Sequence, residues 1–257
     1  MPDILSAMRA RKSVRKFTGV PLTDSQRAAV TDTIARAYNP FARPDILLRD
    51  YATGCRPITP GTYGMIAGCR DWLVCGAMGS EAAALGLGFT GEQAVLEATR
   101  LGLGSCWLGA SFKARDFLTP MPQWPDFYSL KAVIALGNPS SRVGLAGHIA
   151  RLMAGSSRRK AFDTLFTGDS TGAFSKSLEA MRIAPSSLNS QPWRATAIGS
   201  EVHFFTTSLK YMNMIDCGIG LSHFWLAERA AGHEGEFFTA EIIPDGRLAY
   251  VISYRRS

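Results

Sequence analysis

The sequence lacks the residue patterns of several common kinds of site. Its five cysteines include no Cys-x-x-Cys pair, and its four histidines show no spacing typical of metal ligands (Cys55, Cys69, Cys75, Cys106, Cys217, His148, His203, His223 and His233). An odd number of such cysteines favours free, buried thiols in a reducing cytoplasm over a disulfide framework or a zinc site. No serine triad, Cys/His/Asn set or pair of carboxylates is recognisable. We therefore expect no bound metal and no catalytic side chain.

Long apolar segments are also missing. Basic residues interrupt the N-terminal region in which a signal peptide would need an apolar core (Arg9, Arg11, Lys12, Arg15 and Lys16). The most apolar stretch, residues 72–89, is rich in glycine and contains Glu81, so it is a poor membrane span. We expect a soluble, cytoplasmic protein without a membrane partner. A chain of 257 residues with 19% charged residues is long and apolar enough for one large folded domain or two small ones.

Positive charge is concentrated in two segments of a chain whose net charge is +7. The first segment is residues 9–16, and the second is residues 127–162, which contain no Asp or Glu but several cations (Lys131, Arg142, Arg151, Arg158, Arg159 and Lys160). Two solvated basic faces would explain this pattern, and so would two clusters that converge on one phosphate group. No nucleic-acid-reading module is recognisable, so we expect no nucleic-acid partner.

Helices and strands are predicted to alternate in two similar halves. Helices are expected over residues 2–10, 23–38, 92–101, 174–183 and 219–231, and strands over residues 45–52, 71–78, 104–108, 130–136, 201–206, 236–243 and 248–254. Gly102 and Gly232 follow two of the helices as natural C-caps, and each precedes a strand. We divide the chain into a first half (1–136), a connecting segment (137–160) and a second half (161–257), which together form one compact unit.

Three motifs stand out. Arg11-Lys12-Ser13-Val14-Arg15 places three cations and a hydroxyl close together, which suits a phosphate but also an ordinary basic turn. Residues 102–109 join a helix to a strand through glycines, which indicates either tight packing or backbone open to a ligand. Residues 184–193 (APSSLNSQPW) offer hydroxyl, amide and backbone groups on a rigid turn, as a polar heteroaromatic ligand would require.

Taken together, these motifs resemble the nitroreductase family of flavin mononucleotide (FMN) enzymes. Residues 63–68, 91–98 and 215–224 add to the resemblance, which is closest to a subgroup with both halves of the usual dimer in one chain. It implies a three-layer α+β fold, with a mixed, mainly antiparallel sheet flanked by helices and two pseudo-symmetric halves. The segment after the first long helix, residues 38–44, lacks the serines, Asn and Gln of the second-half loop. We therefore expect one FMN per chain, between the halves, with the companion site lost.

The resemblance also implies residue roles. Arg11 and Ser13 would meet the FMN phosphate and the ribityl or ring-edge region, with the cofactor-binding Lys12 between them, and Arg15 would lie near the pyrimidine edge. The backbone of Leu108 and Gly109, in the first half, would contact the flavin ring. A loop of the second half would contact the same ring (Pro185, Ser186, Ser187 and Asn189). The late basic residues Arg158 and Arg159 would lie at the phosphate. Gln191 and Trp193 are expected to support the loop. His223 could donate a proton, but a packed or capping histidine is the favoured interpretation.

The activity implied is hydride transfer from NADH or NADPH through flavin N5 to a nitroaromatic or quinone, by a ping-pong scheme. Flavin reduction, dehydrogenation of a metabolite, and non-catalytic flavin binding are the alternatives on the same fold. Partners would be small-molecule electron acceptors. A monomer is expected, and a homodimer would also be compatible.

Overall fold

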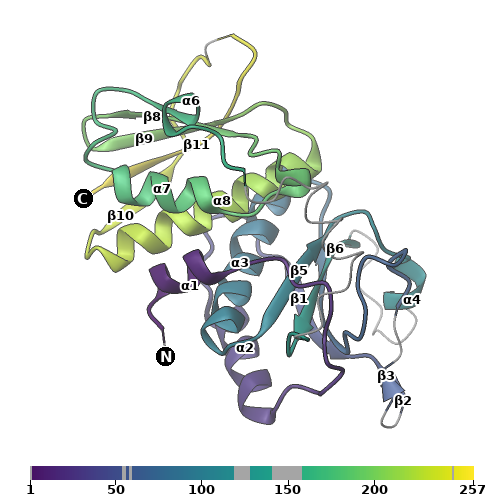
Figure 1. The fold of residues 1–257 in the computed structure, drawn as a ribbon. Helices are drawn as coiled ribbons and strands as arrows, with labels where there is room; N and C mark the ends of the chain where they lie inside the picture. Colours follow the sequence, from purple (N-terminus) through teal and green to yellow (C-terminus); the bar gives the residue numbers. More distant parts are fainter. Residues whose placement is uncertain (1, 54–55, 58–59, 119–127, 141–157, 245) are drawn as a thin grey trace.

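The computed structural model describes residues 2–53, 56–57, 60–118, 128–140, 158–244 and 246–257 (Figure 1). The described part of the first half contains four helices and six strands: α1 (Ile4–Ala10), α2 (Asp24–Arg36), β1 (Asp45–Asp50), β2 (Ala52–Thr53), β3 (Arg56–Pro57), β4 (Asp71–Ala77), α3 (Glu81–Arg100), β5 (Gly104–Leu108), α4 (Ala114–Leu118) and β6 (Ser129–Gly137). The described part of the second half contains α6 (Phe162–Leu165), β7 (Phe166–Thr167), α7 (Ser175–Ile183), the 3-10 turn η1 (Ser187–Asn189), β8 (Trp193–Ile198), β9 (Glu201–Thr206), α8 (Tyr211–Ala230), β10 (Gly235–Phe238) and β11 (Ala249–Arg256).

Most predicted elements are present, and the differences have physical causes. Thr23 caps α2 as predicted: its Oγ1 accepts the Gln26 N–H at 3.2 Å, and the Gln26 side chain accepts the Thr23 N–H at 3.0 Å. Helices α3 and α8 begin at Glu81 and Tyr211, about three turns and about two turns before the predicted starts at residues 92 and 219. Every residue from Ala83 to Leu96 and from Met214 to Phe224 is buried, so these stretches lack the polar face that marks an amphipathic helix. Strand β8 was not predicted.

The two halves repeat one topology. The first sheet has the order β1-β4-β6-β5, and the second has β8-β9-β11-β10 with β7 added beside β8. All neighbouring strands are antiparallel except β7 and β8. In both halves a long helix, α3 or α8, connects the second strand of the four to the third along the chain. The predicted α+β class with mainly antiparallel strands is confirmed, and the strand order repeats in the two halves. Each half has one main sheet, and β2 and β3 form a separate two-stranded sheet in the first half.

Helices α3 and α8 lie between the two sheets and pack against each other (Figure 1). Residues of α8 are numbered 130 higher than their counterparts in α3, from Tyr211 for Glu81 to Ala230 for Arg100. A Cβ on Gly88 would collide with the Ile215 carbonyl oxygen, and a Cβ on Gly218 with that of Leu85. These two contacts are exchanged by the 130-residue shift, which is the reciprocal pattern of a twofold interface.

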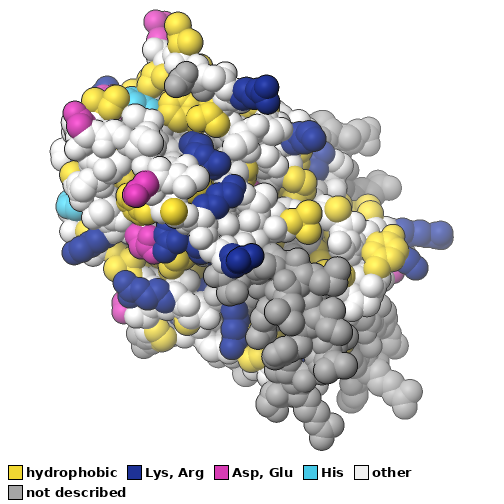
Figure 2. Space-filling model, turned by 45° about the horizontal axis from the view of Figure 1, so that its top comes forward, with side chains coloured by type: hydrophobic (Ala, Val, Ile, Leu, Met, Phe, Trp, Pro, Cys, Tyr) yellow, Lys and Arg dark blue, Asp and Glu magenta, His cyan; other side chains and the backbone are white. Residues whose placement is uncertain are grey.

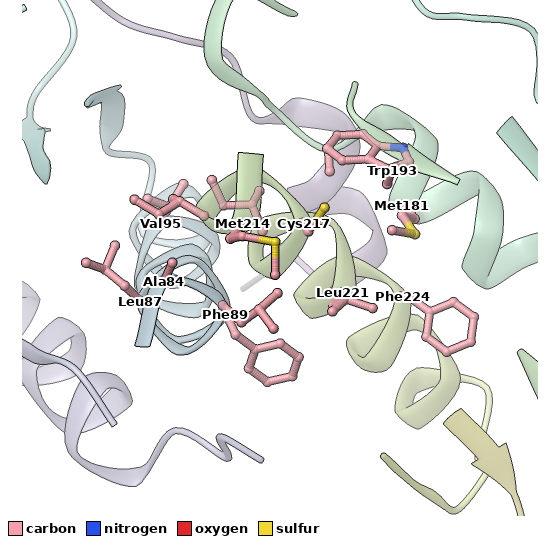
Figure 3. Packing of buried hydrophobic residues seen from close by; sticks show 14 of the residues in the cluster. Ala84, Leu87, Phe89, Val95, Met181, Trp193, Met214, Cys217, Leu221 and Phe224 are labelled. Atoms are coloured by element: carbon pink, nitrogen blue, oxygen red, sulfur yellow. The ribbon is translucent and has the colours of Figure 1, made fainter. Parts of the chain in front are cut away.

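One hydrophobic core runs through both halves. Figure 3 shows Leu87, Phe89 and Val95 of α3 beside side chains of α8, with Trp193 and Met181 beyond them. Helix α1 also packs against both halves, because Ala7 and Met8 contact residues of α3, α7 and α8 (Leu96, Ala180 and Ala227). The two halves are therefore packed as a single unit around the central helix pair.

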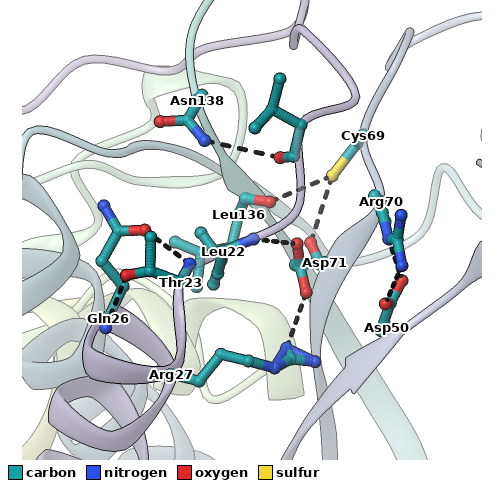
Figure 4. Close-up of polar contacts among 11 residues, drawn as sticks. Leu22, Thr23, Gln26, Arg27, Asp50, Cys69, Arg70, Asp71, Leu136 and Asn138 are labelled. Atoms are coloured by element: carbon teal, nitrogen blue, oxygen red, sulfur yellow. Dashed lines mark hydrogen bonds and ion pairs between the residues drawn. The ribbon is translucent and has the colours of Figure 1, made fainter. Parts of the chain in front are cut away.

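Asp71, at the start of β4, fixes the entry to α2 (Figure 4). Its buried carboxylate accepts the Leu22 N–H at 3.2 Å and pairs with Arg27 at 2.7 Å. Burial raises the pKa of Asp71, while the Leu22 N–H and the Arg27 charge oppose that shift. Next to it, the Cys69 thiol donates to the carbonyl oxygens of Asp71 and Leu136.

The cysteines are free and buried as predicted, within the described ranges (Cys69, Cys75, Cys106 and Cys217). Burial raises the pKa of the Cys217 thiol to about 12 and raises that of Cys69, so both thiols stay protonated. Cys55 lies outside the described residues. Where the chain is described, no cluster of His, Cys, Asp and Glu could hold a metal ion. None of the described helices is long and apolar enough to cross a membrane.

Candidate functional site

A cavity of about 610 Å³ lies between the two halves and takes its walls from both. The first half contributes the basic motif, the end of β5 and parts of two other segments (Arg11, Ser13, Arg15, Met65, Cys106, Trp107, Leu108, Gly109, Ala110, Ser111 and Ala132). The second half contributes the serine-rich loop (residues 184–193) and the start of α8, and the end of the connecting segment contributes one further arginine (Pro185, Ser186, Ser187, Leu188, Asn189, Met212, Ile215, Asp216 and Ile219; Arg159).

The basic motif reaches the cavity because it is extended and lies along β5. Ser13 bridges Ser105 in parallel fashion, and the Val14 N–H donates to the Ser105 carbonyl oxygen at 2.8 Å. Side chains of an extended segment alternate between two sides, so residues two apart point the same way. Arg11, Ser13 and Arg15 accordingly line the cavity, whereas Lys12 between them is exposed and does not.

Three arginines line the cavity and give its wall positive charge (Arg11, Arg15 and Arg159). The Nε atoms of Arg11 and Arg15 are buried and have no hydrogen-bond partner among the described residues. Arg159 donates to Asn189 Oδ1 at 2.5 Å and to the Ile183 carbonyl oxygen at 3.0 Å. Burial, then the charges of Arg11 and Arg182, lower the pKa of Arg159. Positive charge also predominates among the charged side chains of the face in Figure 2. A bound anion would relieve both the desolvation and the repulsion between arginines.

The serine-rich loop is strained and firmly held. Leu188, Asn189 and Gln191 all have positive φ, of 50°, 55° and 46°, in the left-handed region that costs non-glycine residues free energy. Gln191 is buried and binds the loop from inside: its Nε2 donates to the Asn189 carbonyl oxygen at 3.1 Å, and its Oε1 accepts the Lys160 N–H at 2.8 Å. Gln191 therefore supports the loop, as predicted, and fixes the groups that line the cavity.

Asp216 holds the loop from α8. Its Oδ1 accepts the Ser187 N–H at 2.9 Å, and its Oδ2 lies 3.4 Å from Ser190 Oγ. Burial raises the pKa of Asp216 to about 7, against the two hydrogen bonds, which lower it. The carboxyl group is therefore neutral in mildly acidic solution and charged in mildly alkaline solution.

This shift predicts how stability depends on pH. Below about pH 4 Asp216 is protonated whether the chain is folded or unfolded; between about pH 4 and 7 the unfolded chain releases a proton that the folded protein retains. Compared with an Asp216→Asn variant, which keeps the acceptor for Ser187, the wild-type free energy of unfolding should fall with rising pH by up to about 1.4 kcal/mol per unit. Urea unfolding of both proteins from pH 4 to 8 measures the difference. A difference that stays constant across this range contradicts the assignment.

The structure brings together ten of the twelve residues proposed from the sequence and leaves two outside the cavity lining, Lys12 and Arg158. Arg158 is exposed, but its carbonyl oxygen accepts the Asn189 side chain at 2.6 Å, so it supports the loop through its backbone. His223 is fully buried between the helices and does not line the cavity, as the packed interpretation predicted. Trp193 is buried in the core.

Sequence reasoning missed the apolar wall and the anchor of the loop. Met212 and Ile215 come from the start of α8, which was not predicted to be helical, and Ile219 is the first residue of the predicted helix. A helical start at Tyr211 would have placed these residues, with Asp216, on the side of α8 that faces the loop. The available signal was the repeat itself, because helices that end alike before Gly102 and Gly232 are expected to match along the rest of their length.

The position related to the cavity by the repeat is filled by side chains. Gly86 stands where Asp216 would be, and a Cβ on Gly86 would collide with the Ala42 carbonyl oxygen, so the segment after α2 lies directly on α3. Phe237 stands where Trp107 would be. Its ring centroid is 5.8 Å from that of Phe41 and 5.9 Å from that of Phe89, the counterpart of Ile219. Aromatic side chains thus fill the position that corresponds, through the repeat, to the open cavity.

The chain is similar to known proteins in sequence and in fold. The family model described as "Putative TM nitroreductase" matches residues 3–228. The fold is similar to that of a Thermotoga maritima protein described as a "putative nitroreductase", with a TM-score of 0.65, 21% identity, and coverage of 99% of this chain and 93% of that chain.

Two further matches to solved structures each cover little more than half of this chain. A Bacteroides fragilis nitroreductase with bound FMN has a TM-score of 0.43 and 18% identity, over 56% of this chain and 92% of that chain. An FMN-dependent nitroreductase of Clostridium difficile has a TM-score of 0.42 and 17% identity, over 53% of this chain and 88% of that chain. No protein of curated function matches the chain. Because the family model spans most of the sequence, the chain belongs to the nitroreductase family.

Proposed function

We propose that this protein is an FMN-dependent oxidoreductase that takes hydride from NADH or NADPH and reduces nitroaromatic or quinone acceptors. The observation that carries the proposal is the two-sided cavity, in which unpartnered arginine nitrogens of one half face the serine-rich loop of the other. Membership of the nitroreductase family supports an oxidoreductase. The activity itself is a proposal from the chemistry of the lining.

The residues present fit FMN. Arg11 and Arg159 repel each other electrostatically, and a dianionic phosphate would neutralise both. Arg15 offers a cation for the pyrimidine edge of the ring, where reduced flavin carries negative charge. Ser186, Ser187 and Asn189 supply hydroxyl and amide groups on a loop whose shape is already fixed, so little ordering accompanies binding.

FMN, when bound, would supply hydride transfer at its N5 atom. The chain's own residues hold and surround the reacting rings. Leu108 and Gly109 offer backbone at the end of β5, and Met212, Ile215 and Ile219 form an apolar wall that excludes water. A nicotinamide and an acceptor are both planar and would use this wall in turn, so we expect ping-pong kinetics.

We also propose that each chain binds one FMN and works as a monomer. A dimer of such chains would be compatible with one FMN per chain. Arginines reach the cavity from the first half, and the loop reaches it from the second (1–136 and 161–257, joined by 137–160). The related position is packed with Phe41, Phe89 and Phe237. Titration of flavin against protein should therefore reach one equivalent per chain.

An absorption spectrum of the purified protein, followed by NADH or NADPH under anaerobic conditions, tests the function. A flavin spectrum that bleaches on addition and returns with a nitroaromatic or quinone supports the proposal. A yellow protein that supports no turnover with any acceptor leaves only flavin binding. A protein that stays colourless after incubation with FMN contradicts the assignment of the cavity.

A further inference from the structure

A buried hydrogen-bonded chain connects the central helices to the cavity wall. Glu92 of α3 and His223 of α8 are both fully buried, and Oε1 of Glu92 lies 3.0 Å from Nε2 of His223. The other carboxyl oxygen, Oε2, accepts the indole N–H of Trp107 at 2.8 Å. Trp107 lies on β5 and lines the cavity. The chain thus runs from one half, through the interface of the two helices, to the ligand site.

The partners determine where the protons lie. Nδ1 of His223 is 3.1 Å from the carbonyl oxygen of Ala180, which can only accept, so Nδ1 carries a hydrogen. One further proton then lies between Nε2 of His223 and Oε1 of Glu92, because two bare acceptors would repel each other. The pair is neutral as a whole. In both placements of that proton, Oε2 remains an acceptor for Trp107.

Two contacts fix the indole. Its Nε1 is held by Glu92, and its six-membered ring lies against Gly91, the preceding residue of α3. A Cβ on Gly91 would be 2.5 Å from Cη2 of Trp107, so no other residue allows this approach. A ring held at its nitrogen and at its far edge cannot turn within its plane or tilt freely. Its orientation at the cavity is therefore set by α3.

The repeat provides an internal comparison. In the other half Ser222 is the counterpart of Glu92, Phe237 of Trp107, and Gln93 of His223. Ser222 Oγ has no partner among the described residues, and Phe237 has no N–H to donate. The same architecture therefore forms without this network. The network is present only in the half whose strand faces the open cavity, which points to the ligand and not to folding as its reason.

We propose that Glu92 and His223 are positioning residues that hold the Trp107 indole as an aromatic wall for the planar ring bound in the cavity. This inference rests on the proposed function, in which that ring is the flavin. Glu92 acts through Trp107, and His223 acts through Glu92 by fixing the rotamer of the carboxyl group.

FMN titration into the flavin-free protein, followed by flavin fluorescence, tests the proposal. Glu92→Leu removes the acceptor, and Trp107→Phe removes the donor while keeping a ring, as in Phe237. Each should raise the Kd about three- to tenfold, the range expected for a misplaced aromatic contact. Glu92→Gln should stay within about twofold of wild type. Its side-chain oxygen accepts the indole N–H, and its amide donates to a neutral His223. Glu97→Gln, on the same helix but paired with Arg100, is the matched control.

The decisive measurement is the double variant. If Glu92 acts through Trp107, Glu92→Leu should have no further effect on Kd in a Trp107→Phe background. Additive effects, or Glu92→Gln as weak as Glu92→Leu, overturn the positioning role. If Glu92→Leu fails to fold, a Trp107→Phe Kd equal to wild type overturns it as well. A wild-type protein that takes up no FMN overturns the proposed function along with it, whereas normal wild-type binding with unaffected variants overturns this inference alone.

Discussion

Arg11→Ala is expected to weaken FMN binding about ten- to hundredfold. Charge-assisted hydrogen bonds contribute about 1.5–3 kcal/mol each, and Arg11 has a buried Nε that no described residue satisfies. The loss should appear as a higher Kd in equilibrium titration and as colourless protein after gel filtration. Arg159→Ala should act in the same direction, with an added effect on the loop, because Arg159 also holds Asn189.

Lys12→Ala is the matched control for Arg11→Ala. It removes the same charge from the same segment, but Lys12 is exposed and does not line the cavity. Its Kd should remain within about twofold of wild type, the remainder being long-range attraction that salt screens. Ser187→Ala tests the opposite wall and should raise the Kd several-fold. Equal effects of Lys12→Ala and Arg11→Ala would contradict a directed phosphate contact and indicate only general attraction.

Gly88→Ala and Gly218→Ala should each destabilise the fold by about 3 kcal/mol, near the upper end for overpacking. The added Cβ meets a backbone carbonyl oxygen of the facing helix, Ile215 or Leu85, and backbone cannot move aside as a side chain can. The helices must separate, and contacts along their whole length weaken. Such a loss is a large fraction of a typical total stability of about 5–15 kcal/mol.

Denaturant unfolding measures this effect, with Gly79→Ala as the control. Gly79 precedes the N-cap of α3, and a Cβ at this position would meet no described atom within 4 Å. The same substitution should therefore change stability by less than about 1 kcal/mol. The two core variants should also resemble each other, because the repeat exchanges their surroundings. A stable Gly88→Ala protein beside an unstable Gly218→Ala protein would mean that the two helices do not share the contact equally.

The site was more predictable than the core that supports it. The bidentate hydrogen bonding of arginine and the alternation of side chains along an extended segment are local properties. The positions of Arg11, Ser13 and Arg15 therefore follow from a short stretch of sequence. The helical start of α8 does not follow from a short stretch of sequence, because a helix that is buried on nearly all sides has no polar face to mark it. The roles of Glu92 and His223 depend on a contact between residues 131 positions apart, which no local pattern contains.

The proposed division of the chain has a similar basis. The glycines at residues 102 and 232 predicted equivalent helix ends, and both have positive φ, of 77° and 80°. The strand order that makes the halves equivalent emerges only from pairing across each sheet. Residues 141–157, where part of the second basic segment falls, lie outside the described residues, and the expectation for Arg142 and Arg151 remains a prediction.

The difference between Asp216 and Gly86 has a consequence for how this protein can vary. In an assembly of identical subunits, one codon specifies both copies of a position, so a carboxylate that anchors a loop at one place is imposed on the other. Here two codons specify the two related places. Each can be optimised for a separate demand, one for retaining a ligand and the other for rigidity. Saturation mutagenesis should therefore find different tolerated residues at 216 and 86 despite their equivalent places in the repeat.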